Sequence, residues 1–157
     1  MSLRRRWVSR KIGLISFGFF LILVGFIWAN TPGLIDAVVT FFRDFHLEEA
    51  FQNVYLPAPR FPWRHRAVYG AFRQFCIGYG LFQIVVLVLR FAFGSSIRDK
   101  AGTISSIVGW LSLSYFTGLY LTESVDWFAF LAGLVVVIGL SIVVRGVAQI
   151  LMRVFRM

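Results

Sequence analysis

Four apolar stretches in this sequence are each long enough to cross a lipid bilayer. They cover residues 12–28, 67–93, 102–121 and 127–152. A helix needs about 20 predominantly apolar residues to cross the hydrocarbon core, and only helices and closed barrels satisfy every backbone polar group there. The sequence therefore predicts an all-α integral membrane protein, a four-transmembrane-helix bundle that forms one domain over residues 1–157.

The charge of the chain fits a membrane protein better than a nucleic-acid-binding protein. Only 15% of the residues are charged and 59% are hydrophobic, whereas soluble domains average about 25% charged residues. The net charge of +9 comes largely from clusters at the ends of the apolar stretches: Arg4, Arg5, Arg6, Arg10 and Lys11, then Arg98 and Lys100, then Arg153 and Arg156. Because cytoplasmic loops carry excess Lys and Arg, we expect a multi-pass protein of the cell membrane, with both termini cytoplasmic and no nucleic acid as partner.

The segment 31–66, between the first two stretches, is too long to be a bare loop. Thr31 and Pro32 predict the start of a helix, as N-cap and first helical residue. Apolar residues then recur at helical spacing at Leu34, Val38, Phe41, Phe42 and Phe45. We expect an extracytoplasmic amphipathic helix, followed by a second short helix over 48–56 that Pro57, Pro59 and Pro62 terminate. Aromatic residues mark the expected outer boundary at Trp63, Tyr69, Tyr120 and Trp127.

Polar residues recur along one side of the second stretch. Arg73, Gly80, Gln83 and Arg90 share one face of a helix at about 100° per residue. Such a line faces protein or a water-filled cavity. Two interpretations stay open: an interface between helices with an arginine near each end, or an anion-attracting pathway lined by Arg73, Gln83 and Arg90.

Arg90 and Arg145 each close an apolar run near the predicted cytoplasmic edge. An unpaired buried arginine is costly, and Asp99 is the only acidic residue expected on that side. Anionic lipid on the cytoplasmic side is the first interpretation. Carbonyl oxygens at helix ends, an anionic ligand and an acid from a partner subunit are the alternatives.

Small residues four apart mark the third and fourth stretches as packing helices. The pairs are Ser105 with Gly109, Ser114 with Gly118, and Ala129 with Gly133. Such pairs let helix backbones approach closely in lipid. We expect them to pack within the bundle, and an additional seam between copies of the chain fits the same pattern.

No catalytic or cofactor motif is present. The one cysteine, Cys76, lies in an apolar run and is expected to be a small buried residue. The only titratable cluster, His46, Glu48, Glu49 and His65, lies in the segment 31–66 and lacks a recognised metal-ligand spacing. We expect no cofactor and no metal.

The function that these features favour is a non-catalytic, oligomerising or accessory subunit of a membrane complex. One alternative is a homo-oligomeric, anion-preferring channel lined by the second helix, because rings of arginine select anions. Another is an outer-face, metal-dependent membrane enzyme that uses the histidine and carboxylate cluster. Lipids, copies of the chain or a larger complex are the expected partners.

Overall fold

The computed structural model describes the backbone of residues 3–154 and the side chains of residues 11–154. The side chains of Arg4, Arg5, Arg6, Arg10 and Arg156, which carry part of the charge pattern, lie outside the described residues. Four helices are long and apolar enough to cross a membrane. They are α1 (Leu3–Asn30), α3 (Arg66–Ala92), α4 (Ile97–Leu121) and α5 (Trp127–Val154). The chain is therefore a helical membrane protein, as predicted.

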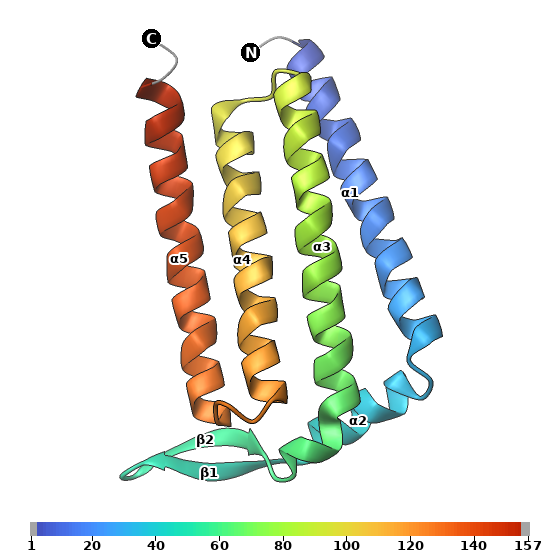
Figure 1. The fold of residues 1–157 in the computed structure, drawn as a ribbon, viewed down its shortest axis with the longest axis vertical. Coiled ribbons are helices and arrows are strands. Elements are labelled where there is room, and N and C mark those ends of the chain that lie inside the picture. Colours follow the sequence, from blue (N-terminus) through green and yellow to red (C-terminus); the bar gives the residue numbers. More distant parts are fainter. Residues whose placement is uncertain (1–2, 155–157) are drawn as a thin grey trace.

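The four long helices stand side by side in the order α1, α3, α4, α5 (Figure 1). Helix α4 packs against both α3 and α5, and α1 packs against α3. Helix α1 begins and α5 ends at the same end of the bundle, where the α3–α4 connection also lies (Figure 1). The segment between α1 and α3 lies across the opposite end, together with the α4–α5 connection.

Helix α4 begins earlier than the apolar stretch alone predicts. Ser96 is its N-cap, and the Ser96 hydroxyl accepts a hydrogen bond of 3.1 Å from the Asp99 amide. Serine is a favoured N-cap because its side chain satisfies one of the amides that the first turn leaves free. The first turn of α4 is therefore polar, and its apolar part starts one turn further along.

The segment 31–66 begins with the predicted amphipathic helix, α2 (Leu34–Arg43). Its N-cap is Gly33 and not Thr31, so the predicted start was wrong. Gly33 has a φ of 72°, a left-handed conformation that glycine adopts without steric cost. The helix therefore begins after Gly33, and Pro32 lies in the preceding turn.

The second helix predicted over 48–56 is absent, and an antiparallel β-hairpin takes its place. Strand β1 (Phe45–Phe51) pairs with β2 (Val54–Pro59), and a short 3-10 helix, η1 (Pro62–His65), leads into α3. Asn53 makes the turn with a φ of 62°, which asparagine tolerates better than most residues. The fold thus combines four long apolar helices with a small two-stranded sheet at one end of the bundle.

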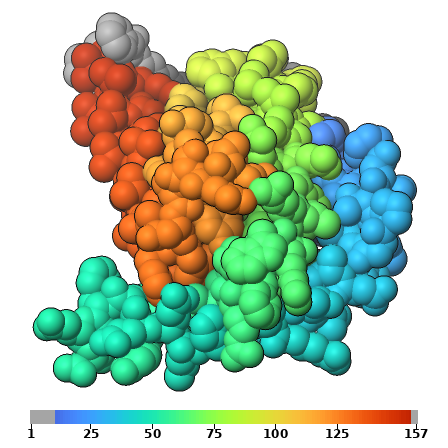
Figure 2. Space-filling view, turned by 60° about the horizontal axis from the view of Figure 1, so that its bottom comes forward, coloured from blue at the N-terminus to red at the C-terminus, as the bar shows by residue number. Residues whose placement is uncertain are grey.

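The buried aromatic core lies at the hairpin end of the bundle. Tyr69, Tyr120 and Phe130 form it, with Trp127 and Phe41 packed around them. Further along the helices, large apolar side chains are exposed on the outer faces, among them Ile22, Val135 and Ile142. Such surfaces suit lipid as the surrounding solvent. Figure 2 shows the hairpin projecting past α5 at the edge of the molecule.

Candidate functional site

The α3 polar line, defined as Arg73, Gly80, Gln83 and Arg90, faces α4. The guanidinium carbon of Arg73 lies 3.3 Å from the position that a Cβ on Gly118 would occupy, and Leu111 comes within 2.9 Å of the corresponding position on Gly80. Gln83 is buried. These contacts make Gly80 and Gln83 part of an interface with α4 inside the chain, while Arg73 at one end of the line is exposed.

Arg90 reaches α4 at the other end of this line. Its Nη1 donates a hydrogen bond to the backbone carbonyl of Asp99, in the first turn of α4. The sequence suggested several partners for Arg90, and the one that the structure shows is a carbonyl oxygen at a helix end. Arg90 thus ties the end of α3 to the start of α4.

Arg145 differs from Arg90 in its surroundings. It is exposed on α5. The Tyr120 ring contacts the rings of Tyr69 and Trp127, with centroid separations of 4.9 and 5.8 Å. These three residues therefore lie at the same height along the axis of the bundle. From that level Arg90 lies about 32 Å along α3 and Arg145 about 27 Å along α5, at about 1.5 Å per residue. Both distances are close to the thickness of a hydrocarbon core, which is about 30 Å.

The small residues occupy close contacts between helices at some positions only. The Ser105 hydroxyl donates to the Ser141 carbonyl at 2.5 Å, and a Cβ on Gly109 would lie 2.8 Å from the Ser141 hydroxyl. A Cβ on Gly133 would lie 2.5 Å from the Phe116 ring. Ser114 is buried on α4, whereas Ala129 is exposed on α5.

One hydrogen-bonded pair of side chains joins the hairpin end of the chain to the start of α3. The Asp44 Oδ2 lies 2.9 Å from His65 Nε2, and the Phe61 amide donates to the same oxygen at 2.8 Å. The hydrogen bonds from His65 and Phe61 and the charge of nearby Arg60 lower the pKa of Asp44 below its ordinary value of 3.8. We call Asp44 and His65 the hairpin latch. It holds the segment after α2 against the start of α3.

Two further contacts fix the hairpin to the helices. The Trp127 indole donates a hydrogen bond of 2.9 Å to the Pro57 carbonyl, joining the start of α5 to β2. The Phe45 ring packs edge-on against the same indole, with centroids 5.7 Å apart. The root of the hairpin is therefore anchored at both strands, and its distal part extends from this anchor.

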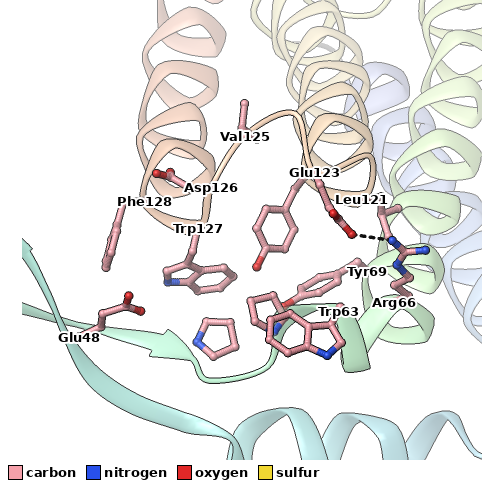
Figure 3. Close-up of a pocket in the computed structure, with 13 residues that line it drawn as sticks. Glu48, Trp63, Arg66, Tyr69, Leu121, Glu123, Val125, Asp126, Trp127 and Phe128 are labelled. Atoms are coloured by element: carbon pink, nitrogen blue, oxygen red, sulfur yellow. Dashed lines mark hydrogen bonds and ion pairs between the residues drawn. The ribbon is translucent and has the colours of Figure 1, made fainter.

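An open pocket of about 430 Å³ lies beneath the hairpin, between η1, the start of α3 and the α4–α5 connection. We call it the hairpin pocket; its lining residues include Glu48, Trp63, Arg66, Tyr69, Tyr120, Glu123, Asp126 and Trp127. Figure 3 shows the Arg66–Glu123 ion pair at one side of it, with a separation of 2.7 Å. The sequence predicted these aromatic residues as boundary markers and missed the pocket, because its walls come from separate parts of the chain.

The predicted histidine and carboxylate cluster does not assemble. His65 is paired with Asp44, and Glu48 lines the hairpin pocket. The Glu49 carboxylate accepts a hydrogen bond of 3.1 Å from the Asn53 amide in the hairpin turn. Within the described part of the chain, no three histidine, cysteine or carboxylate side chains come together as a metal site.

Comparison of the chain with protein-family models, with curated proteins and with solved structures found no match. No activity is therefore carried over from a relative.

Proposed function

We propose that this protein is a non-catalytic accessory subunit of a membrane complex, and that the hairpin is its docking element. The observation that carries this proposal is an apolar surface on the distal part of the hairpin. Leu47, Phe51 and Tyr55 are 70%, 71% and 57% exposed. Exposed apolar patches of this kind mark interaction sites on proteins.

The alternation of the strands indicates which way this surface faces. Glu48 lines the hairpin pocket, on the side of the helices. Successive side chains of a strand point to opposite faces, so Leu47, Glu49 and its cross-strand partner Tyr55 lie on the face opposite to Glu48. Phe45 of the same face packs against Trp127 at the root of the hairpin, and the part of the face beyond that contact is left exposed. The hairpin lies beyond the ends of the long helices (Figure 1). A protein partner is the occupant that would cover it.

The free edge of β1 supports the same proposal. Within the described residues, β1 pairs only with β2. Strand β2 contains Pro57 and Pro59, which have no amide hydrogen to donate and suit an edge. An extended segment of a partner would therefore add more readily to the edge of β1, in the manner of strand addition.

Glycines on α5 support a second contact with a partner, inside the membrane. A Cβ on Gly139 or Gly146 would meet nothing within 4 Å, so neither glycine serves packing within the chain. Small residues on a helix surface favour close approach of another helix. We infer that a partner, either a copy of the chain or another subunit, packs against this face of α5.

We also infer the orientation and the lipid contacts from charge. The basic α3–α4 connection lies at the same end as the start of α1 and the end of α5, and the positive-inside rule puts that end in the cytoplasm. The hairpin is then extracytoplasmic. Arg145, exposed near the cytoplasmic edge, is the residue we propose to meet anionic lipid.

The docking proposal is tested by photo-crosslinking in the native membrane. A photoreactive amino acid at Tyr55 should give a discrete crosslinked band, because this side chain faces the partner. The matched control is the same amino acid at Asp36, which is exposed on α2. A band from Tyr55 that the Leu47→Asn variant abolishes supports the proposal. Equal crosslinking from both positions, or none from Tyr55, would contradict it.

A further inference from the structure

The hairpin pocket has the walls of a cation-binding site. Aromatic side chains supply much of its surface: Trp63, Tyr69, Tyr120, Trp127 and Phe128. The faces of aromatic rings carry partial negative charge and attract cations, most strongly when the cation is organic and weakly hydrated. The pocket is open at one side and has a volume of about 430 Å³, which is enough for a small organic ion.

The charge of the pocket is opposite to that of the whole chain. The protein has a net charge of +9 and only seven acidic residues. Three of those seven, Glu48, Glu123 and Asp126, line this pocket against a single guanidinium, that of Arg66. Arg66 is paired with Glu123, so the carboxylates of Glu48 and Asp126 remain to balance a cation. Figure 3 shows Glu48 turned from β1 toward the start of α5.

Two buried tyrosine hydroxyls also belong to the pocket. Tyr69 and Tyr120 are 6% and 7% exposed, and both line the pocket. The two hydroxyls interact with each other, and neither has a further hydrogen-bond partner in the described structure. Figure 3 shows the Tyr69 ring directed toward the centre of the pocket. A hydroxyl can donate one hydrogen bond and accept two, so the pair retains capacity to bond an oxygen of a ligand.

We propose that the hairpin pocket binds an organic ammonium group, either a protonated amine or a quaternary ammonium. The ammonium lies against the Trp63 and Trp127 rings, and Glu48 and Asp126 balance its charge. An oxygen of the same ligand meets the tyrosine hydroxyls. The pocket lies at the ends of membrane-spanning helices, at the level where lipid headgroups lie. The ammonium therefore comes from a zwitterionic lipid headgroup or from a free small molecule.

The first arm of the test uses soluble probes and the unaltered protein. The protein, purified in a maltoside detergent, is titrated by calorimetry with choline and with 3,3-dimethylbutan-1-ol, which has the same shape without the charge. We expect choline to bind at least tenfold more tightly. Equal binding of the two compounds would show an apolar pocket without a cation site and would overturn the proposal.

Conservative variants test whether choline binding depends on the carboxylates of Glu48 and Asp126. The double variant Glu48→Gln with Asp126→Asn removes both charges, and asparagine preserves the N-cap contact in which Asp126 accepts from the Ala129 amide. We expect at least a tenfold loss of choline affinity at an unchanged melting temperature. Asp36→Asn, which removes one carboxylate on α2, should leave the affinity unaltered. A double variant that binds choline normally would contradict the assignment.

The second arm separates the two sources of the ammonium. Native mass spectrometry after extraction from nanodiscs of phosphatidylethanolamine and phosphatidylglycerol reports which lipid is retained. Retention of phosphatidylethanolamine that the double variant abolishes supports a lipid headgroup. Binding of choline without any lipid preference supports a free amine. If the unaltered protein shows neither choline binding nor a preference for phosphatidylethanolamine, the proposal is overturned.

Discussion

At the scale of single residues, the structure separates glycines that serve helix packing from glycines that do not. A Cβ on Gly133 would come within 2.5 Å of the Phe116 ring. A Cβ on Gly139, in the same helix, would meet no other atom within 4 Å. Similar glycines in the sequence therefore have different roles, which only the positions of their neighbours reveal.

We expect Gly133→Ala to lower the free energy of unfolding by about 1–3 kcal/mol, because overpacking displaces the Phe116 ring. Gly139→Ala should leave it unchanged or raise it by up to about 1 kcal/mol, since alanine is the better helix former. Unfolding in mixed detergent and dodecyl sulfate measures both. A Gly133→Ala variant as stable as Gly139→Ala would show that α4 and α5 are not in this contact.

Arg90 and Arg145, near the end of the bundle that we propose to be cytoplasmic, also have different roles. Arg90→Ala removes the hydrogen bond to the Asp99 carbonyl, so we expect a loss of about 1.5 kcal/mol, the lower end of the range for hydrogen bonds that involve a charged group. Arg145→Ala, at an exposed position, should change stability by no more than about 0.5 kcal/mol. Thermal unfolding in detergent compares them. Equal losses would contradict the distinction.

At the scale of elements, the hairpin latch predicts a change at acid pH. The pKa of Asp44 is lowered in the folded state from its ordinary 3.8. A carboxyl group with a depressed folded pKa contributes stability above its unfolded pKa and loses it as the pH falls through the folded value. The latch should therefore be intact at neutral pH and weaken below about pH 4.

A fluorotryptophan label at position 127 reports this change by fluorine NMR, because Trp127 is hydrogen-bonded to Pro57 of the hairpin. We expect its resonance to stay constant from neutral pH to about pH 4 and to shift below it. In Asp44→Asn the resonance should be shifted already at neutral pH. A resonance that is the same in both proteins throughout would show that Asp44 does not position the hairpin.

The elements also show what local sequence can and cannot predict. The long helices follow from apolar length alone, and α2 follows from its periodicity. The hairpin was missed because Leu47, Glu48 and Ala50 lie in a run of good helix formers, while what fixes the strands is distant in sequence. Trp127 holds β2 through Pro57, and His65 holds Asp44. Asn53 between Phe51 and the Val54–Tyr55 pair was the local turn signal available.

The candidate sites also differ in how far local sequence alone predicts them. The α3 polar line was predictable because helical spacing alone puts Arg73, Gln83 and Arg90 on one face. The helix that packs against this line was not predictable, since nothing in the sequence of α3 identifies α4 as that helix. The hairpin pocket was harder to foresee, because it combines the hairpin, the start of α3 and the α4–α5 connection.

At the scale of the whole molecule, the charge pattern predicts which end faces the cytoplasm. Cys76 is the only cysteine and is buried, so single cysteines introduced elsewhere report their own accessibility. We expect a cysteine at Asn53 to react with a membrane-impermeant maleimide on intact cells. One at Arg98 should react only after the membrane is opened. The reverse pattern would invert the orientation and move the hairpin into the cytoplasm.

The most direct measurement of the proposed role is native mass spectrometry of the protein extracted gently from its own membrane. We expect an assembly, either of copies of this chain or with another polypeptide, that the Leu47→Asn variant reduces to the single chain while its melting temperature is retained. A single chain in the unaltered protein, under conditions that preserve other membrane complexes in the same sample, would contradict the proposal that it is a subunit.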